Sequence, residues 1–118
     1  MLGGIEEALR EIAAGRIVIV TDDEDRENEG DFVMAAEKAT PADVNFMALH
    51  GRGLICVSAP GERIDALGLR QMVQRNTSLY DTPFTESIDY RHGTTTGISA
   101  FDRAETIRAF ADPRRGPD

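Results

Sequence analysis

The sequence predicts an α/β (α+β) fold, a layered domain in which helices flank a mixed β-sheet. Short runs of β-branched and other apolar residues occur between segments whose apolar residues recur at helical spacing, although the alternation is not strict. The chain has 118 residues, of which 41% are hydrophobic, and this is enough apolar material for one core. We therefore expect residues 1–118 to belong to a single domain.

The N-terminal third predicts one helix and two strands. Apolar residues at helical spacing predict a helix over residues 5–14, and Gly15 stands where a C-terminal cap belongs. The β-branched run at residues 17–21 predicts a buried strand. After an acidic stretch, residues 32–36 predict a second strand.

The middle of the chain predicts two further helices around a strand. Thr40 can cap a helix that has Pro41 at its first position, and this helix should run to about residue 50. The apolar residues 54–58 predict a strand that contains the single cysteine, Cys56. Residues 60–67 predict a short helix, which a glycine ends.

The last third predicts two loops, a strand and a helix. Residues 74–83 are polar and rich in turn formers, so we expect a loop there. Residues 84–90 predict a strand, and residues 93–97 predict a tight loop of glycine and threonine. A last helix should open near Ser99 and end before Pro113.

The charge balance is strongly acidic, with 21 Asp and Glu against 13 Lys and Arg and a net charge of −8. Such a chain repels nucleic acid and anionic membranes, so neither is expected as a partner. The longest apolar run, residues 17–20, is too short to cross a bilayer. A single cysteine suits a reducing compartment, and the N-terminus lacks the features of a signal peptide, so we expect a cytoplasmic protein.

The stretch of residues 22–31 carries seven carboxylates and one arginine, and three interpretations of it compete. The first is a solvated acidic turn, which the flanking apolar strands and the bend permitted at Gly30 make less favourable. The second is a calcium loop of the EF-hand kind, which fails because Ala36 stands where the last ligand should be and both flanks are strands. The third is a magnesium or manganese site for carbohydrate chemistry, since hard carboxylate oxygens suit these ions and crowded carboxylates can divide the roles of acid and base.

Residues 22–31 resemble the acidic signature loop of the 3,4-dihydroxy-2-butanone 4-phosphate synthase family without a break. Four further segments resemble later motifs of that family in the same order: residues 50–56, 76–78, 84–85 and 95–107. The resemblance implies a lyase of riboflavin biosynthesis that converts D-ribulose 5-phosphate to 3,4-dihydroxy-2-butanone 4-phosphate and formate. It also implies a homodimer whose active sites lie at or near the subunit interface.

The resemblance implies roles for five residues. Glu27 would be the ligand of Mg²⁺ or Mn²⁺ and would also touch the substrate. Arg26 and Asp31 would contact the sugar phosphate, Asp31 through substrate hydroxyls. Glu29 and Asp31 would be the catalytic acids or bases. Thr95 would donate hydrogen bonds to the substrate.

The family domain continues with a Pro-Gly-His motif, a Gly-Gly-His-Thr-Glu block and a late glutamate, none of which this sequence contains. In the family, the second metal ligand is the histidine of that block, and neither His50 nor His92 matches it. We therefore expect residues 1–118 to correspond to the N-terminal part of the domain and to lack turnover alone. The alternative is a non-catalytic remnant with at most weak binding of a divalent metal ion or sugar phosphate. Cys56 is expected to be a small buried residue near the pocket.

Overall fold

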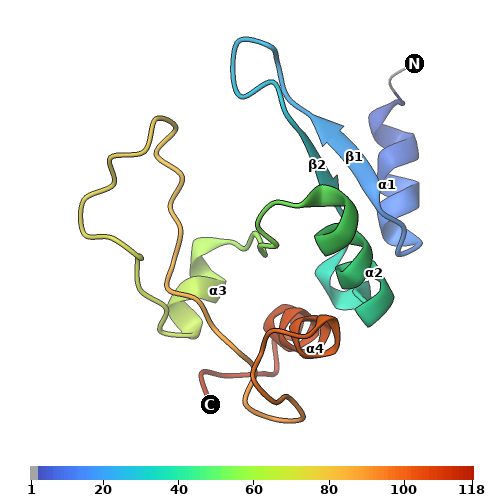
Figure 1. The fold of residues 1–118 in the computed structure, drawn as a ribbon. Coiled ribbons are helices and arrows are strands. Elements are labelled where there is room, and N and C mark those ends of the chain that lie inside the picture. The colour runs from blue at the N-terminus through green and yellow to red at the C-terminus, as the bar shows by residue number, and fades with distance from the viewer. Residues whose placement is uncertain (1–2) are drawn as a thin grey trace.

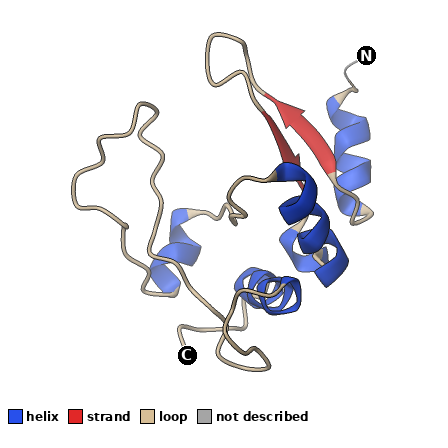
Figure 2. Cartoon of the chain, viewed as in Figure 1, coloured by secondary structure: helices blue, strands red, loops and turns tan. Residues whose placement is uncertain are grey.

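The computed structural model describes residues 3–118, and Met1 and Leu2, part of the N-terminus considered above, lie outside the described residues. Helices and strands follow one another along the chain without a repeat, and Figures 1 and 2 show their arrangement. The elements in chain order are α1 (Ile5–Ala13), β1 (Val18–Thr21), β2 (Gly30–Val33), the 3₁₀-helix η1 (Ala36–Lys38), α2 (Pro41–Phe46), the π-helical turn η2 (Met47–Gly51), α3 (Gly61–Ala66) and α4 (Ala100–Ala111).

β1 and β2 form an antiparallel hairpin, with Val18 opposite Val33 at one end and Thr21 opposite Gly30 at the other. The combination of helices and a sheet confirms the α/β class. Within residues 3–118, however, the sheet has only these two antiparallel strands, so the chain does not build the mixed sheet that was expected.

Two predicted strands are wrong. The segments at residues 54–58 and 84–90 are irregular, and the second contributes only an isolated bridge between Gln71 and Thr85. Their apolar residues favour extended backbone, but a strand exists only where a neighbour satisfies its N–H and C=O groups. Neither segment has such a neighbour along its length in the described part of the chain.

The four predicted helices are confirmed, because their signals are local. Thr40 and Asp43 form a reciprocal capping box at the start of α2, with Pro41 in the first turn. Ser99 accepts a hydrogen bond from the main-chain N–H of Asp102 at the start of α4. The helix after Thr40 continues through η2 as expected, and Arg52, at φ 59° in the left-handed conformation, caps its end.

The core is small and lies where η1, α2 and α4 meet. Its fully buried apolar side chains are those of Ala39, Val44 and Ala104. One face of the hairpin packs on α2 through Phe32, whose ring lies 5.2 Å from that of Phe46. The prediction of a buried first strand is wrong, since Ile19 at the centre of β1 is 67% exposed.

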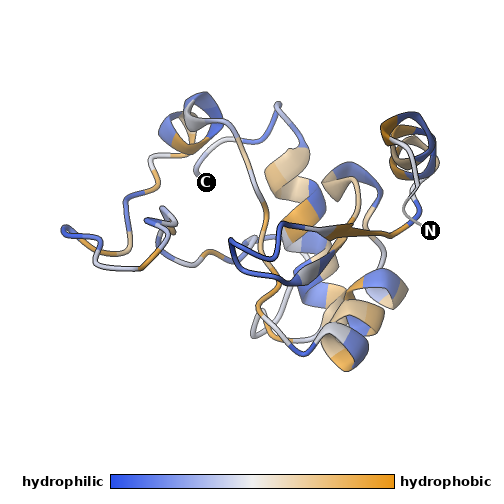
Figure 3. Ribbon diagram, turned by 90° about the horizontal axis from the view of Figure 1, so that it is seen from above, coloured by the Kyte–Doolittle hydropathy of each residue, from blue (hydrophilic) through white to orange (hydrophobic). Residues whose placement is uncertain are grey.

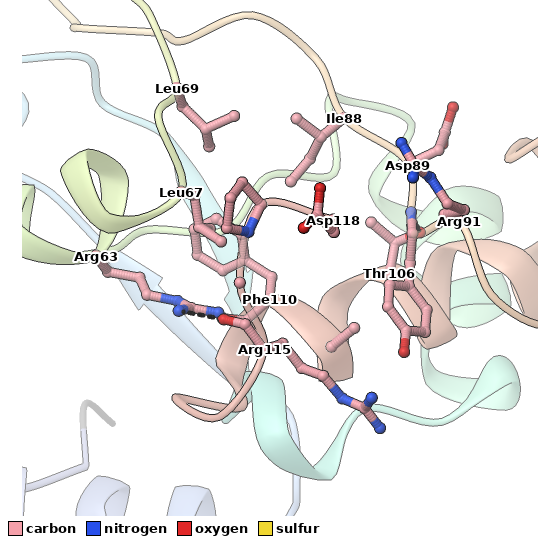
Figure 4. Close-up of a pocket in the computed structure, with 14 residues that line it drawn as sticks. Arg63, Leu67, Leu69, Ile88, Asp89, Arg91, Thr106, Phe110, Arg115 and Asp118 are labelled. Atoms are coloured by element: carbon pink, nitrogen blue, oxygen red, sulfur yellow. Dashed lines mark hydrogen bonds between the residues drawn. The ribbon is translucent and has the colours of Figure 1, made fainter.

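α3 is fastened to the far end of α4 by one side chain. Arg63 donates hydrogen bonds to the carbonyl oxygens of Phe110, Asp112 and Arg115 at 2.9–3.0 Å. The carbonyls of Phe110 and Asp112 lie at the C-terminal end of α4, where a cation is favoured. A cavity of about 150 Å³ opens beside this clamp, lined by Leu67, Phe110 and other residues of both helices and the tail (Figure 4).

Hydropathy changes sharply along the hairpin. Figure 3 shows apolar colour along the strands of the hairpin and strongly hydrophilic colour at the loop that joins them. None of the helices within residues 3–118 combines the length and apolar character needed to cross a membrane.

Candidate functional site

The hairpin presents the acidic stretch as a projecting loop. Thr21 and Gly30 form the last pair of the ladder, so residues 22–29 make the connection between the strands. Figure 1 shows this loop extending beyond the helices at one end of the molecule. Asn28 adopts the left-handed conformation, with φ 52°, which lets the chain turn back into β2.

Asp22 organises the loop from its first position. Its carboxylate accepts hydrogen bonds of 2.9 Å from the main-chain N–H groups of Glu27 and Glu29. It also accepts one of 2.9 Å from Nη1 of Arg26. These donors, the N–H groups of Glu29 and Glu27 first, lower the pKa of Asp22, so the carboxylate stays ionised.

Arg26 is the single cation of the loop and is held on several sides. Besides its bond to Asp22, its Nη2 lies 3.0 Å from Oε1 of Glu27. The hydrogen bond to Asp22 and the charge of Glu27 raise the pKa of Arg26. From outside the loop, the hydroxyl of Tyr80 donates to the main-chain oxygen of Arg26 at 2.7 Å.

The structure brings four of the five expected site residues together on one hairpin. Glu27 is half-buried and Glu29 is exposed, and both lie in the loop. Asp31 is exposed on β2, opposite Val20. The hairpin thus carries one cation and three carboxylates, groups whose chemistry suits a phosphate and a divalent cation.

Thr95, the fifth expected residue, lies elsewhere. Its main-chain N–H and its hydroxyl both donate to Oδ2 of Asp102, at 3.0 and 2.8 Å. The N–H of Gly97 donates to the same oxygen at 3.0 Å. Asp102 is only 2% exposed, and these bonds, that of the Thr95 hydroxyl first, lower its pKa.

The two loops are far apart within one chain. Figure 1 shows the acidic loop at the top and the loop of residues 93–97, in orange, at the bottom. The donors of Thr95 are already used by Asp102, and its hydroxyl oxygen keeps only lone pairs for a further partner. The cavity beside Arg63 is lined by none of the five expected site residues.

The carboxylates fit a partial metal site. Among residues 3–118, no three His, Cys, Asp or Glu side chains gather closely enough to hold a metal ion by themselves. Mg²⁺ needs no such cage, because it keeps waters and is held by one or two carboxylates together with substrate oxygens. Glu27 fits this pattern, since one of its two oxygens faces Arg26 and the other remains for a cation.

Reasoning from the sequence missed two residues that shape these loops. Asp102 stands at the third helical position after the cap Ser99, so the cap spacing could have singled it out. No sequence signal connects Tyr80 with Arg26, which lies 54 positions away. The expectation for Cys56 was wrong in one respect, because its side chain is exposed in an irregular segment and is not buried in a strand.

The comparisons with known sequences agree with one another. A family model described as 3,4-dihydroxy-2-butanone 4-phosphate synthase matches residues 6–118. The 3,4-dihydroxy-2-butanone 4-phosphate synthase of Agrobacterium fabrum is 54% identical over 114 residues, which cover 97% of this chain and 54% of that protein. The riboflavin biosynthesis protein RibBA of Porphyromonas gingivalis is 54% identical over 117 residues, which cover 98% of this chain and 29% of that protein. The chain therefore spans about half, or less, of the length of these curated relatives.

Solved structures match equally well. A 3,4-dihydroxy-2-butanone 4-phosphate synthase in complex with two magnesium ions superimposes with a TM-score of 0.96 and 43% sequence identity, over 98% of this chain and 54% of that one. A cation-free form of such a synthase superimposes with a TM-score of 0.90 and 41% identity, over 99% of this chain and 53% of that one.

Proposed function

Because this chain belongs to the 3,4-dihydroxy-2-butanone 4-phosphate synthase family, we propose that it acts in riboflavin biosynthesis as a lyase on D-ribulose 5-phosphate. The products are 3,4-dihydroxy-2-butanone 4-phosphate and formate. The observation that carries the proposal is the arrangement of the acidic loop, where Arg26 and Glu27 lie side by side and Asp22 holds the main chain that bears Glu27 and Glu29. The net charge of −8 makes the chain repel nucleic acid, so nucleic acid is not a partner in this proposal.

The side chains of the hairpin have different proposed roles, which follow from their chemistry. The guanidinium of Arg26 offers planar donors that suit a phosphate group. Asp31 accepts hydrogen bonds from substrate hydroxyls, and Glu29, in a loop crowded with carboxylates, carries protons to and from the sugar carbons. Each of these roles is a proposal that the exposure of the three side chains on one hairpin supports.

Glu27 is proposed to hold a divalent cation, either Mg²⁺ or Mn²⁺. Its free carboxylate oxygen is a hard donor that suits both ions. The related synthase solved with two magnesium ions supports the choice of a divalent cation. When bound, such a cation supplies Lewis-acid stabilisation of negative charge on substrate oxygens.

We also propose a homodimer, located in the cytoplasm. If Thr95 belongs to the same site as Arg26, a second copy must supply it, because the two loops lie at opposite ends of one chain (Figure 1). A reducing cytoplasm suits the single free cysteine, Cys56.

The test is formate release from ribulose 5-phosphate in the presence of Mg²⁺. We would assay a chimera in which residues 6–118 of this chain replace the matching segment of the Agrobacterium fabrum synthase. Glu27→Gln should lower the rate of the chimera by about 100-fold or more and raise the Mg²⁺ concentration it needs, since a metal ligand is lost. Glu24→Gln is the matched control, because Glu24 is an exposed acid of the same loop. An inactive chimera, or equal effects of the two substitutions, would contradict the proposal.

A further inference from the structure

The polar segment between α3 and α4 includes a long loop, residues 71–85, which we call the excursion. Its tip contacts the acidic loop at one point. Its base is closed by the bridge between Gln71 and Thr85 and by the hydrogen bond from the N–H of Met72 to the oxygen of Phe84 at 2.9 Å. Figure 1 shows the segment, in yellow, projecting from the body on the same side as the acidic loop. Tyr80, near its tip, makes the contact with Arg26.

Tyr80 holds Arg26 in two ways. Its hydroxyl donates to the main-chain oxygen of Arg26 at 2.7 Å. Its ring lies below the guanidinium, with 5.7 Å between Cζ of Arg26 and the ring centroid, which is within the range of a cation–π interaction. With Asp22 on Nη1 and Glu27 on Nη2, the guanidinium is fixed at both amino groups and on one face.

Burial does not account for this residue. Tyr80 is 46% exposed, and its neighbour Leu79 is 84% exposed, so the tip of the excursion adds little to the core. The polar end and the ring of Tyr80 both meet the same residue, which lies 54 positions away in the sequence.

We propose that Tyr80 is a positioning residue that sets the orientation of Arg26 toward the phosphate group of the substrate. The proposal rests on the function proposed above. Tyr80 does not touch the substrate, and it links the excursion of residues 71–85 mechanically to the acidic loop. A substrate that meets Arg26 therefore meets a guanidinium whose position is already restricted, and it loses less entropy on binding.

Two substitutions separate the two contacts, and a third serves as the control. Tyr80→Phe removes the hydroxyl and keeps the ring, whereas Tyr80→Leu removes both. In the chimera, the KM for ribulose 5-phosphate should rise about 2- to 10-fold in Tyr80→Phe, the range of one neutral hydrogen bond. It should rise further in Tyr80→Leu because the cation–π contact is also lost, while kcat stays within about twofold. Tyr90→Phe, which changes the other tyrosine of the chain, should leave both constants unchanged.

A double-mutant cycle shows whether the effect passes through Arg26. In an Arg26→Ala background, Tyr80→Leu should no longer change KM, because the phosphate contact is already absent. Equal rises in both backgrounds, or no rise in Tyr80→Leu, would overturn the proposal. Circular dichroism of each variant checks folding. If Tyr80→Leu does not fold, the effect of Tyr80→Phe on KM, alone and in the Arg26→Ala background, decides the proposal.

A second readout needs no turnover. The chain has two tyrosines and no tryptophan, so Tyr90→Phe leaves Tyr80 as the only strong near-ultraviolet chromophore. In that variant of the full chain, Arg26→Ala should shift the tyrosine absorption band and its fluorescence, whereas Arg10→Ala, a change on α1, should not. An unchanged spectrum would show that the guanidinium of Arg26 does not lie against the ring of Tyr80, because Arg26→Ala keeps the main-chain oxygen that accepts from the Tyr80 hydroxyl. An inactive unsubstituted chimera with the expected spectral shift would instead reject the proposed function and leave the contact standing.

Discussion

The carboxylate of Asp22 accepts a hydrogen bond from the main-chain N–H of Glu27 at 2.9 Å. The proposed metal ligand is therefore held by another acid of the same loop, five positions earlier. The same carboxylate accepts the N–H of Glu29 and a guanidinium proton of Arg26, so one side chain sets the positions of three proposed site residues. The crowding of negative charge at residues 22–31 is relieved from inside the loop by these donors.

Asp22→Asn tests this internal support. An asparagine keeps one acceptor oxygen but loses the negative charge and part of the set of three hydrogen bonds. We expect the affinity of the full chain for Mg²⁺ to fall by about 10-fold, the usual effect of losing a partner that orients a metal ligand. Isothermal titration of the chain with Mg²⁺ measures it.

Asp25→Asn is the control for charge, because Asp25 is an exposed acid of the same loop. It removes the same formal charge without touching the hydrogen bonds of Asp22. Equal losses of affinity in the two variants would mean that Asp22 acts only through its charge.

The helices could be predicted from the sequence because each carries its own boundary signals. Thr40, Pro41 and Asp43 stand next to one another in the sequence and meet in one capping box. Strands depend on partners that the sequence does not identify. Residues 54–58 have the composition of a strand, yet Leu54 is 84% exposed and the segment is irregular.

The candidate site also contains residues that a short motif identifies and residues that only the fold brings together. The proposed roles of Arg26, Glu27 and Asp31 come from one short motif, and one hairpin carries all three. The contact of Tyr80 could not be predicted from the sequence, since a contact across 54 positions depends on the path of the intervening chain. Thr95 was placed with the acidic residues on the strength of its motif, whereas within one chain its donors serve Asp102.

The carboxylate of Asp102 should make the stability of the chain depend on pH. Its pKa in the folded chain is lowered below the ordinary value of 3.8, chiefly by the hydroxyl of Thr95. A depressed folded-state pKa adds stability that is fully present above the ordinary value and is lost as the pH falls through the folded value. The melting temperature should therefore be nearly constant from neutral pH to about 5 and should fall steeply below about 4.

Asp102→Asn isolates this contribution from those of other acids whose pKa is also lowered, such as Asp22 and Asp112. The variant should melt at a lower temperature at neutral pH, and the gap to the unsubstituted chain should narrow on acidification. Thermal denaturation followed by circular dichroism between pH 7 and 3 measures both curves. A gap that stays constant over this range would rule out the ionised carboxylate of Asp102 as the source of the stability.

Two glycines in the loop of residues 93–97 are expected to respond differently to substitution by alanine. Gly93 and Gly97 both adopt left-handed backbone, with φ of 76° and 83°, so alanine at either position is strained by about 1–2 kcal/mol. They differ in their surroundings. A Cβ at Gly97 would overlap the carboxylate of Asp89, whereas a Cβ at Gly93 would meet nothing within 4 Å.

Gly97→Ala should therefore destabilise the chain more than Gly93→Ala, because Asp89 must move aside and the N–H of Gly97 must still reach Asp102. Chemical denaturation of both variants gives the difference directly, since the backbone strain is common to both. Asp89→Ser, added to Gly97→Ala, should recover part of the loss by removing the clashing carboxylate. If the two alanine variants are equally stable, the close approach of Asp89 does not constrain the loop, and the hydrogen bonds of Asp102 alone determine its shape.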